Sequence, residues 1–109
     1  MVEQAYQGVW IYKAPRAMFP CAVFDTKQKA IEWIFENKIS GCLTLYPINK
    51  SVYDWAIEIQ FFVPKKPEHF TPKYIGSFTS AALEHYHFEF DENGEFIANA
   101  SSDIEDISI

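Results

Sequence analysis

Hydrophobic residues gather in several short runs of this chain, bounded by polar and turn-forming residues, a pattern typical of β-strands. Residues 9–12 form a β-rich run behind Gly8, and residues 42–46 form a second run that Pro47 closes. Residues 22–24 predict a shorter extended piece between them. These stretches predict at least three strands in the first half of the chain.

The strictest alternation lies in residues 84–90. Successive side chains of a strand point to opposite faces, so the rings form one row and the polar groups another. Asn93-Gly94 follows and favours a type I′ hairpin turn, with residues 95–99 as the returning strand. The two rows are Tyr86, Phe88 and Phe90 on one face, and His85, His87 and Glu89 on the other.

Residues 26–38 have the 3.6-residue period of an amphipathic helix. Its apolar positions are Ala30, Ile31, Ile34 and Phe35. Asp25 or Thr26 is expected to cap its start, and Ser40-Gly41 is expected to end it.

Two shorter helices are predicted after residue 50. Ser51 followed by Asp54 fits an N-terminal capping pattern, which favours a helix through residue 58. Trp55, Ile57 and Ile59 also alternate as in a strand, so a strand is the alternative there. Pro72 suits the first turn of another short helix, over residues 72–78.

Together these elements predict a single α+β domain over residues 1–99. Its centre is a mostly antiparallel sheet of four or five strands, packed by one main helix over residues 26–38 plus short helices. Residues 100–109 are acidic and contain Ile104, Ile107 and Ile109 as their large apolar side chains. We expect a mobile tail there, which a partner can order.

Charge divides the chain by position. All nine Lys and Arg lie at or before Lys73, while residues 84–109 hold eight of the fifteen acids. Residues 1–83 therefore carry a formal charge of +2 and residues 84–109 carry −8. A field of one sign at one end of the chain indicates a cationic partner rather than a particular fold.

Other classes of function find little support in the sequence. Nucleic-acid binding is disfavoured because the basic residues are dispersed and the pI is about 4.9. Glycine-rich phosphate-binding motifs are absent from the sequence. The first residues do not resemble a signal peptide and no run is long and apolar enough to span a membrane, which predicts a soluble cytoplasmic protein. Cys21 and Cys42 are then expected to be buried free thiols.

The chemically richest group is the polar row His85, His87 and Glu89. His69, Cys21 or Cys42 could complete a metal site with this row, but the paired ligand spacings of zinc sites are absent. A cysteine beside one of the two histidines could instead form a thiol–imidazole pair. We expect a solvated polar face, with no bound metal, no cofactor and no catalytic residue.

Several motifs resemble those of a family of small, uncharacterised bacterial domains. The resemblance covers about residues 9–91, and small acidic members of this family resemble immunity proteins of toxin–immunity systems, including contact-dependent growth inhibition. It implies a protein-binding function and no established enzymatic activity. The motifs are Leu43-Thr44-x-Tyr46-Pro47, Tyr53-Asp54-Trp55-Ala56, Phe61-Phe62-x-Pro64-Lys65-Lys66, Ile75-Gly76-x-Phe78-Thr79-Ser80 and Glu84-His85-Tyr86-His87-Phe88-Glu89.

The leading hypothesis is an immunity protein, monomeric when free, that neutralises a basic, nuclease-type toxin by occluding its active site. Carboxylates would meet the cations that hold the toxin's substrate, and aromatic anchors would fill its cleft. The alternatives are a small metal- or thiol-dependent enzyme built on His85 and His87, and an interaction module without a toxin partner. The predicted partner-binding residues are Asp91, Glu92, Glu95, Asp103, Glu105, Asp106, Tyr53, Asp54 and Trp55.

Overall fold

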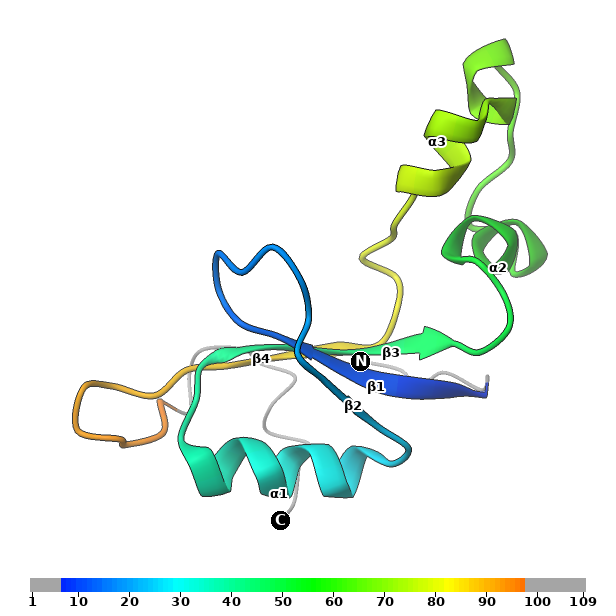
Figure 1. Cartoon of the computed structure of the whole chain (residues 1–109). Helices are drawn as coiled ribbons and strands as arrows, with labels where there is room; N and C mark the ends of the chain where they lie inside the picture. The colour runs from blue at the N-terminus through cyan, green and yellow to red at the C-terminus, as the bar shows by residue number, and fades with distance from the viewer. Residues whose placement is uncertain (1–6, 98–109) are drawn as a thin grey trace.

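Four strands form an antiparallel sheet in the order β2-β1-β3-β4 (Figure 1). The computed structural model describes residues 7–97. The strands are β1 (Gly8–Lys13), β2 (Ala22–Phe24), β3 (Gly41–Pro47) and β4 (His85–Phe88). The α+β class and the four-stranded sheet are confirmed. In place of the predicted returning strand, the described residues show an isolated bridge between Phe90 and Phe96.

The strand register explains why one face of the sheet is apolar. Tyr12 pairs with Leu43, and Leu43 pairs with Tyr86, so three large side chains form one row across β1, β3 and β4. All three are buried. The neighbouring residue in each strand points to the opposite face. There Lys13 and His87 are exposed, so the two faces of the sheet differ sharply.

Helix α1 (Lys27–Asn37) covers the apolar face (Figure 1). The Thr26 hydroxyl caps its start by accepting the Lys29 backbone N–H at 3.2 Å, as predicted. The helix ends within one residue of its predicted end, at the C-cap Lys38, which adopts the left-handed conformation with φ 54° and donates its N–H to the Ile34 carbonyl. Ser40-Gly41 is therefore not the stop. The helix buries Ala30, Ile31 and Ile34.

The segment between β3 and β4 forms an arm that projects from one end of the sheet, on the side away from α1 (Figure 1). It contains α2 (Val52–Glu58), the 3₁₀ turn η1 (Pro67–Phe70) and α3 (Pro72–Ser77). Ser51 caps α2 by accepting the Asp54 N–H, and Thr71 caps α3 by accepting the Tyr74 N–H. The helical prediction for residues 51–58 is confirmed, and the strand alternative is wrong.

The arm has an apolar cluster of its own. Trp55, Ala56 and Leu83 are buried together, at the junction between the arm and the sheet. Further out, the Tyr53 ring lies against Phe62 and Phe78. The first cluster, between the sheet and α1, is a separate group of buried residues. The described part of the chain thus has two apolar clusters. Within residues 7–97, no helix is long and apolar enough to cross a membrane.

Candidate functional site

The predicted acidic site centres on the hairpin that follows β4. Gly94 donates its N–H to the Asp91 carbonyl, and Asp91 donates its N–H to the Glu95 carbonyl, both at 2.9 Å. Positive φ occurs at Gly94, at 80°, and not at Asn93. A type I′ turn needs positive φ at both central residues, so that prediction is wrong. The arrangement fits a type I turn followed by a left-handed glycine, the usual three-residue hairpin loop.

The hairpin acids have different roles. The Asp91 carboxylate accepts the N–H groups of Asn93 and Glu95, each at 2.9 Å, so it holds the turn in shape. Glu92 and Glu95 are exposed. Within residues 7–97, no hairpin carboxylate forms a salt bridge. Glu92 and Glu95 therefore present negative charge to solvent, and no cation within residues 7–97 pairs with it.

The C-terminal end of α1 lies beside this hairpin. The Phe35 ring packs against Phe90 and Phe96, with centroids 5.4 and 4.8 Å away. No basic residue lies in the last turn of α1, where the helix dipole is negative. Lys38, just after the helix, extends its side chain along Gly94 and is the cation nearest to the turn among the described contacts. The hairpin and the helix end together form a predominantly acidic surface.

The Tyr53-Asp54-Trp55 group is divided by its helix. Tyr53 and Trp55 are buried, at 6% and 2% exposure, and Asp54 is exposed. The Tyr53 hydroxyl donates to the His69 carbonyl at 2.9 Å, which ties α2 to η1. Of the three predicted contact residues, Asp54 alone presents its side chain at the surface, and the structure places it in the arm rather than in the hairpin. The two rings hold the arm together.

Three predicted contact residues, Asp103, Glu105 and Asp106, lie outside the described residues. The predicted tail at 100–109 lies outside them as well. Glu84, one of the eight acids of residues 84–109, is 1% exposed and is therefore not part of the acidic surface. Its Oε2 lies 3.7 Å from the Lys27 Nζ and accepts the Tyr86 hydroxyl. The alternation that buries Tyr86 and Phe88 also points Glu84 toward α1, and that signal was available in the sequence.

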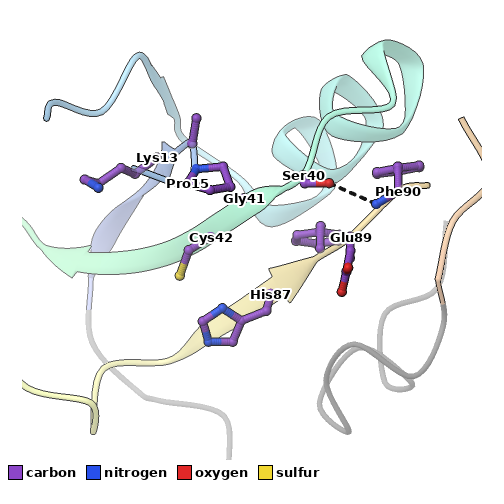
Figure 2. A pocket seen from close by; sticks show the side chains of 10 residues that line it. Lys13, Pro15, Ser40, Gly41, Cys42, His87, Glu89 and Phe90 are labelled. Atoms are coloured by element: carbon purple, nitrogen blue, oxygen red, sulfur yellow. Dashed lines mark hydrogen bonds between the residues drawn. The ribbon is translucent and has the colours of Figure 1, made fainter. Parts of the chain in front are cut away.

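The sheet face away from α1 brings Cys42 beside His87, which is one of the cysteine–histidine combinations that the sequence left open. Lys13, Cys42 and His87 are register partners across β1, β3 and β4. They border an open hollow of about 610 Å³, lined also by Glu89 and by backbone of β3. Figure 2 shows the Cys42 sulfur turned toward the His87 ring. The strand register, which no single-residue pattern specifies, creates this pair.

Two contacts fix the surroundings of the pair. The Cys42 sulfur lies 3.5 Å from the Thr44 hydroxyl oxygen. His85 Nδ1 lies 2.7 Å from the Leu83 carbonyl, which only accepts, so this nitrogen carries the proton. The His85 and His87 rings meet edge to face at 5.2 Å. His87 thus has a neighbour whose orientation is set by the backbone.

The other residues named for a metal site are dispersed. His69 lies in the arm, where its Nδ1 accepts the N–H groups of Lys65 and Lys66 at 3.0 and 3.2 Å. Cys21 is exposed at the start of β2, contrary to the buried thiol predicted, and Cys42 is half-buried; both are free. Among residues 7–97, no group of three His, Cys, Asp or Glu is placed to hold a metal ion.

A comparison with protein families gives one match. Residues 9–97 match a domain of unknown function, DUF7710. The chain belongs to the DUF7710 family. The matched range includes the sheet apart from Gly8, together with α1, the arm and the acidic hairpin, so the candidate site lies within the DUF7710 domain. Neither the curated proteins nor the solved structures contain a significant match.

Proposed function

We propose that this DUF7710 domain is a binding protein whose acidic hairpin end docks on a basic protein, and that it serves as an immunity protein. The observation that carries the proposal is the exposed pair Glu92 and Glu95. Neither forms a salt bridge within residues 7–97, and the hairpin that carries them contacts the last turn of α1 through Phe90 and Phe96. Such a surface attracts a basic partner over long range and selects it by charge.

Affinity also needs an apolar contact that excludes water. The buried rings of Tyr53 and Trp55 cannot supply it in this conformation. Phe90 and Phe96 are only half-buried and flank the acidic turn, with centroids 5.4 Å apart. A partner that covers the hairpin would bury the rest of these rings while its cations meet the carboxylates. In the immunity role, this contact occludes the cationic cleft of a nuclease-type toxin.

The first experiment is affinity capture from the native host with the tagged full chain, followed by mass spectrometry. We expect a basic protein. Expressed alone, that protein should arrest growth, and co-expression of this chain should restore growth. A captured basic protein that is harmless would refute the immunity role and leave a docking module. Capture of acidic proteins alone would refute the whole proposal.

The second experiment measures association of the captured protein with charge variants. Glu92→Gln/Glu95→Gln spares the structural Asp91 and should slow association by about tenfold at low salt. The matched control is Glu32→Gln/Glu68→Gln, which removes the same charge from two exposed acids that form no salt bridge within residues 7–97 and should leave the rate nearly unchanged. The two rates should converge as salt screens the charges. Equal slowing by both pairs would mean that net charge, and not the hairpin, attracts the partner.

The tail acids need a separate measurement. Truncation after residue 99 removes Asp103, Glu105 and Asp106 and leaves the hairpin intact. If these acids only steer the partner, the truncated chain should associate more slowly with an unchanged dissociation rate. A faster dissociation would show that they contact the partner directly.

A further inference from the structure

A thiol and an imidazole are neighbours on the side of the sheet away from α1. Cys42 in β3 and His87 in β4 are register partners, so their Cβ atoms are about 4.5–5.5 Å apart. Figure 2 shows the sulfur turned toward the ring. His87 is exposed and Cys42 is half-buried, so solvent reaches the imidazole while the sulfur lies within the hollow. This pairing is independent of the acidic hairpin.

We propose that Cys42 is a reactive thiol, activated by His87, that exchanges with small disulfides carrying carboxylates. A thiol reacts as its anion, and a neighbouring imidazole can take up the proton. The Thr44 hydroxyl, 3.5 Å from the sulfur, can donate a hydrogen bond to that anion. His85 contacts the His87 ring and is itself held by the Leu83 carbonyl. The site therefore has a nucleophile, a base and an orienting contact.

The hollow favours a small ligand. Its volume of about 610 Å³ lies within the usual range for small-molecule sites, about 300–1,000 Å³. The charged and titratable groups around it are Lys13, His85, His87 and Glu89. Lys13 is exposed at the rim on β1 and can meet a carboxylate. Glu89, on the opposite side, repels one, so Lys13 and Glu89 should have opposite effects on an anionic reagent.

The reaction is a balanced thiol–disulfide exchange. The Cys42 thiol gives its proton to His87, and the sulfur anion attacks one sulfur of the small disulfide. A new bond forms between Cys42 and that sulfur while the original S–S bond breaks. The leaving thiolate takes the proton from His87 and departs as a free thiol. No other oxidant or reductant takes part.

The second cysteine provides an internal comparison. Cys21 is exposed and Cys42 is only half-exposed, so simple access favours Cys21. Glutathione disulfide is the probe, and intact mass gives the rate for Cys21→Ser, which retains Cys42, and for Cys42→Ser, which retains Cys21. We expect Cys42 to react about tenfold faster near pH 7. An equal or slower rate at Cys42 would refute the proposal.

The role of His87 is tested in the Cys21→Ser background. His87→Gln should slow the reaction about tenfold near pH 7, whereas the matched His85→Gln should have a smaller effect. The difference should vanish as pH rises above about 8.5, where bulk solvent ionises a thiol without help. A loss that is the same at every pH would indicate a structural effect and contradict the base role. Circular dichroism checks that His87→Gln and a second variant, His87→Asn, keep the fold.

The preference for carboxylates has its own test. Lys13→Gln should slow the reaction with glutathione disulfide and leave the reaction with neutral 4,4′-dithiodipyridine unchanged. Glu89→Gln should speed the reaction with the anionic reagent alone. If Lys13→Gln changes the rates of both reactions equally, the Lys13 side chain affects access to Cys42 rather than attraction of a carboxylate, and the assigned ligand class is wrong.

Discussion

The Lys27 ammonium lies 3.7 Å from the Glu84 carboxylate, at the junction of α1 and the start of β4. Glu84 is almost fully buried, and Lys27 is one-third exposed. The same ammonium lies 5.0 Å from the centre of the Tyr86 ring and 5.9 Å from that of Trp10. A charge inside the core is stable only with such partners, because burial removes its hydration. This contact therefore ties α1 to the last strand of the sheet.

Loss of the ammonium should destabilise the fold. Lys27→Met should lower the free energy of unfolding by about 1–3 kcal/mol, because the buried Glu84 loses its cationic neighbour. The matched control is Lys29→Met, whose partner Asp25 is exposed; such a pair contributes about 0–1 kcal/mol. Urea unfolding measures both. Equal losses for the two variants would mean that Glu84 does not depend on Lys27.

The turn geometry predicts opposite effects at two glycines. Gly94→Ala should destabilise by about 1–2 kcal/mol, because φ is positive there and the new Cβ would meet the Lys38 side chain at 3.0 Å. Gly76→Ala should stabilise by about 0.5–1 kcal/mol, because this helical position has open space around it. Thermal unfolding distinguishes them. If Gly94→Ala left the free energy of unfolding unchanged, residue 94 would not have the positive φ of this turn.

The core prediction concerns Phe88, which is 3% exposed between the sheet and α1. Phe88→Ala should cost about 3–5 kcal/mol through lost burial and the cavity left behind. Phe19→Ala is the matched control, because this ring is 73% exposed in the β1–β2 loop. Its effect should stay within about 0.5 kcal/mol. Chemical denaturation of the two variants under one set of conditions gives the comparison.

Tyr12 predicts a stability loss at high pH. Burial, and secondarily the nearby Cys21, raises the pKa of the Tyr12 hydroxyl, which donates to the Ser40 carbonyl. The unfolded chain ionises near pH 10, so this stabilisation is complete below pH 10 and declines as pH rises toward the folded pKa. Tyr12→Phe should be less stable at pH 8, and the gap should narrow above pH 10. Denaturation at several pH values measures the stability difference between the parent and Tyr12→Phe. A difference that does not change with pH would contradict a raised pKa of the Tyr12 hydroxyl.

Local sequence patterns were sufficient for the strands and for the helix starts. The Thr26 and Ser51 caps and the apolar period of α1 depend on neighbours within one or two turns. The end of α1 was predicted within one residue, but the stop signal is Lys38 rather than Ser40-Gly41, because Lys38 adopts a left-handed conformation that is more common for glycine or asparagine. The hairpin was placed correctly, but the roles of Asn93 and Gly94 were wrong.

The candidate sites needed tertiary information. Glu84 looked like one more surface acid because its partner Lys27 lies in a distant helix. Cys42 with His87 was one of several possible cysteine–histidine pairs in the sequence, and the β3–β4 register selects it. A shift of one residue in that register would send these side chains to opposite faces. Tyr53 and Trp55 were expected at a partner surface, and the packing of the arm buries them.

The arm packs around an apolar cluster of its own, so substitutions on its exposed surface should have little effect on the packing of the sheet against α1. Phe70 and Val63 are 59% and 60% exposed on the arm, outside the cluster between the sheet and α1. Substitutions at these positions leave that cluster intact. The exposed positions of the arm can therefore change while the sheet and α1 keep their packing.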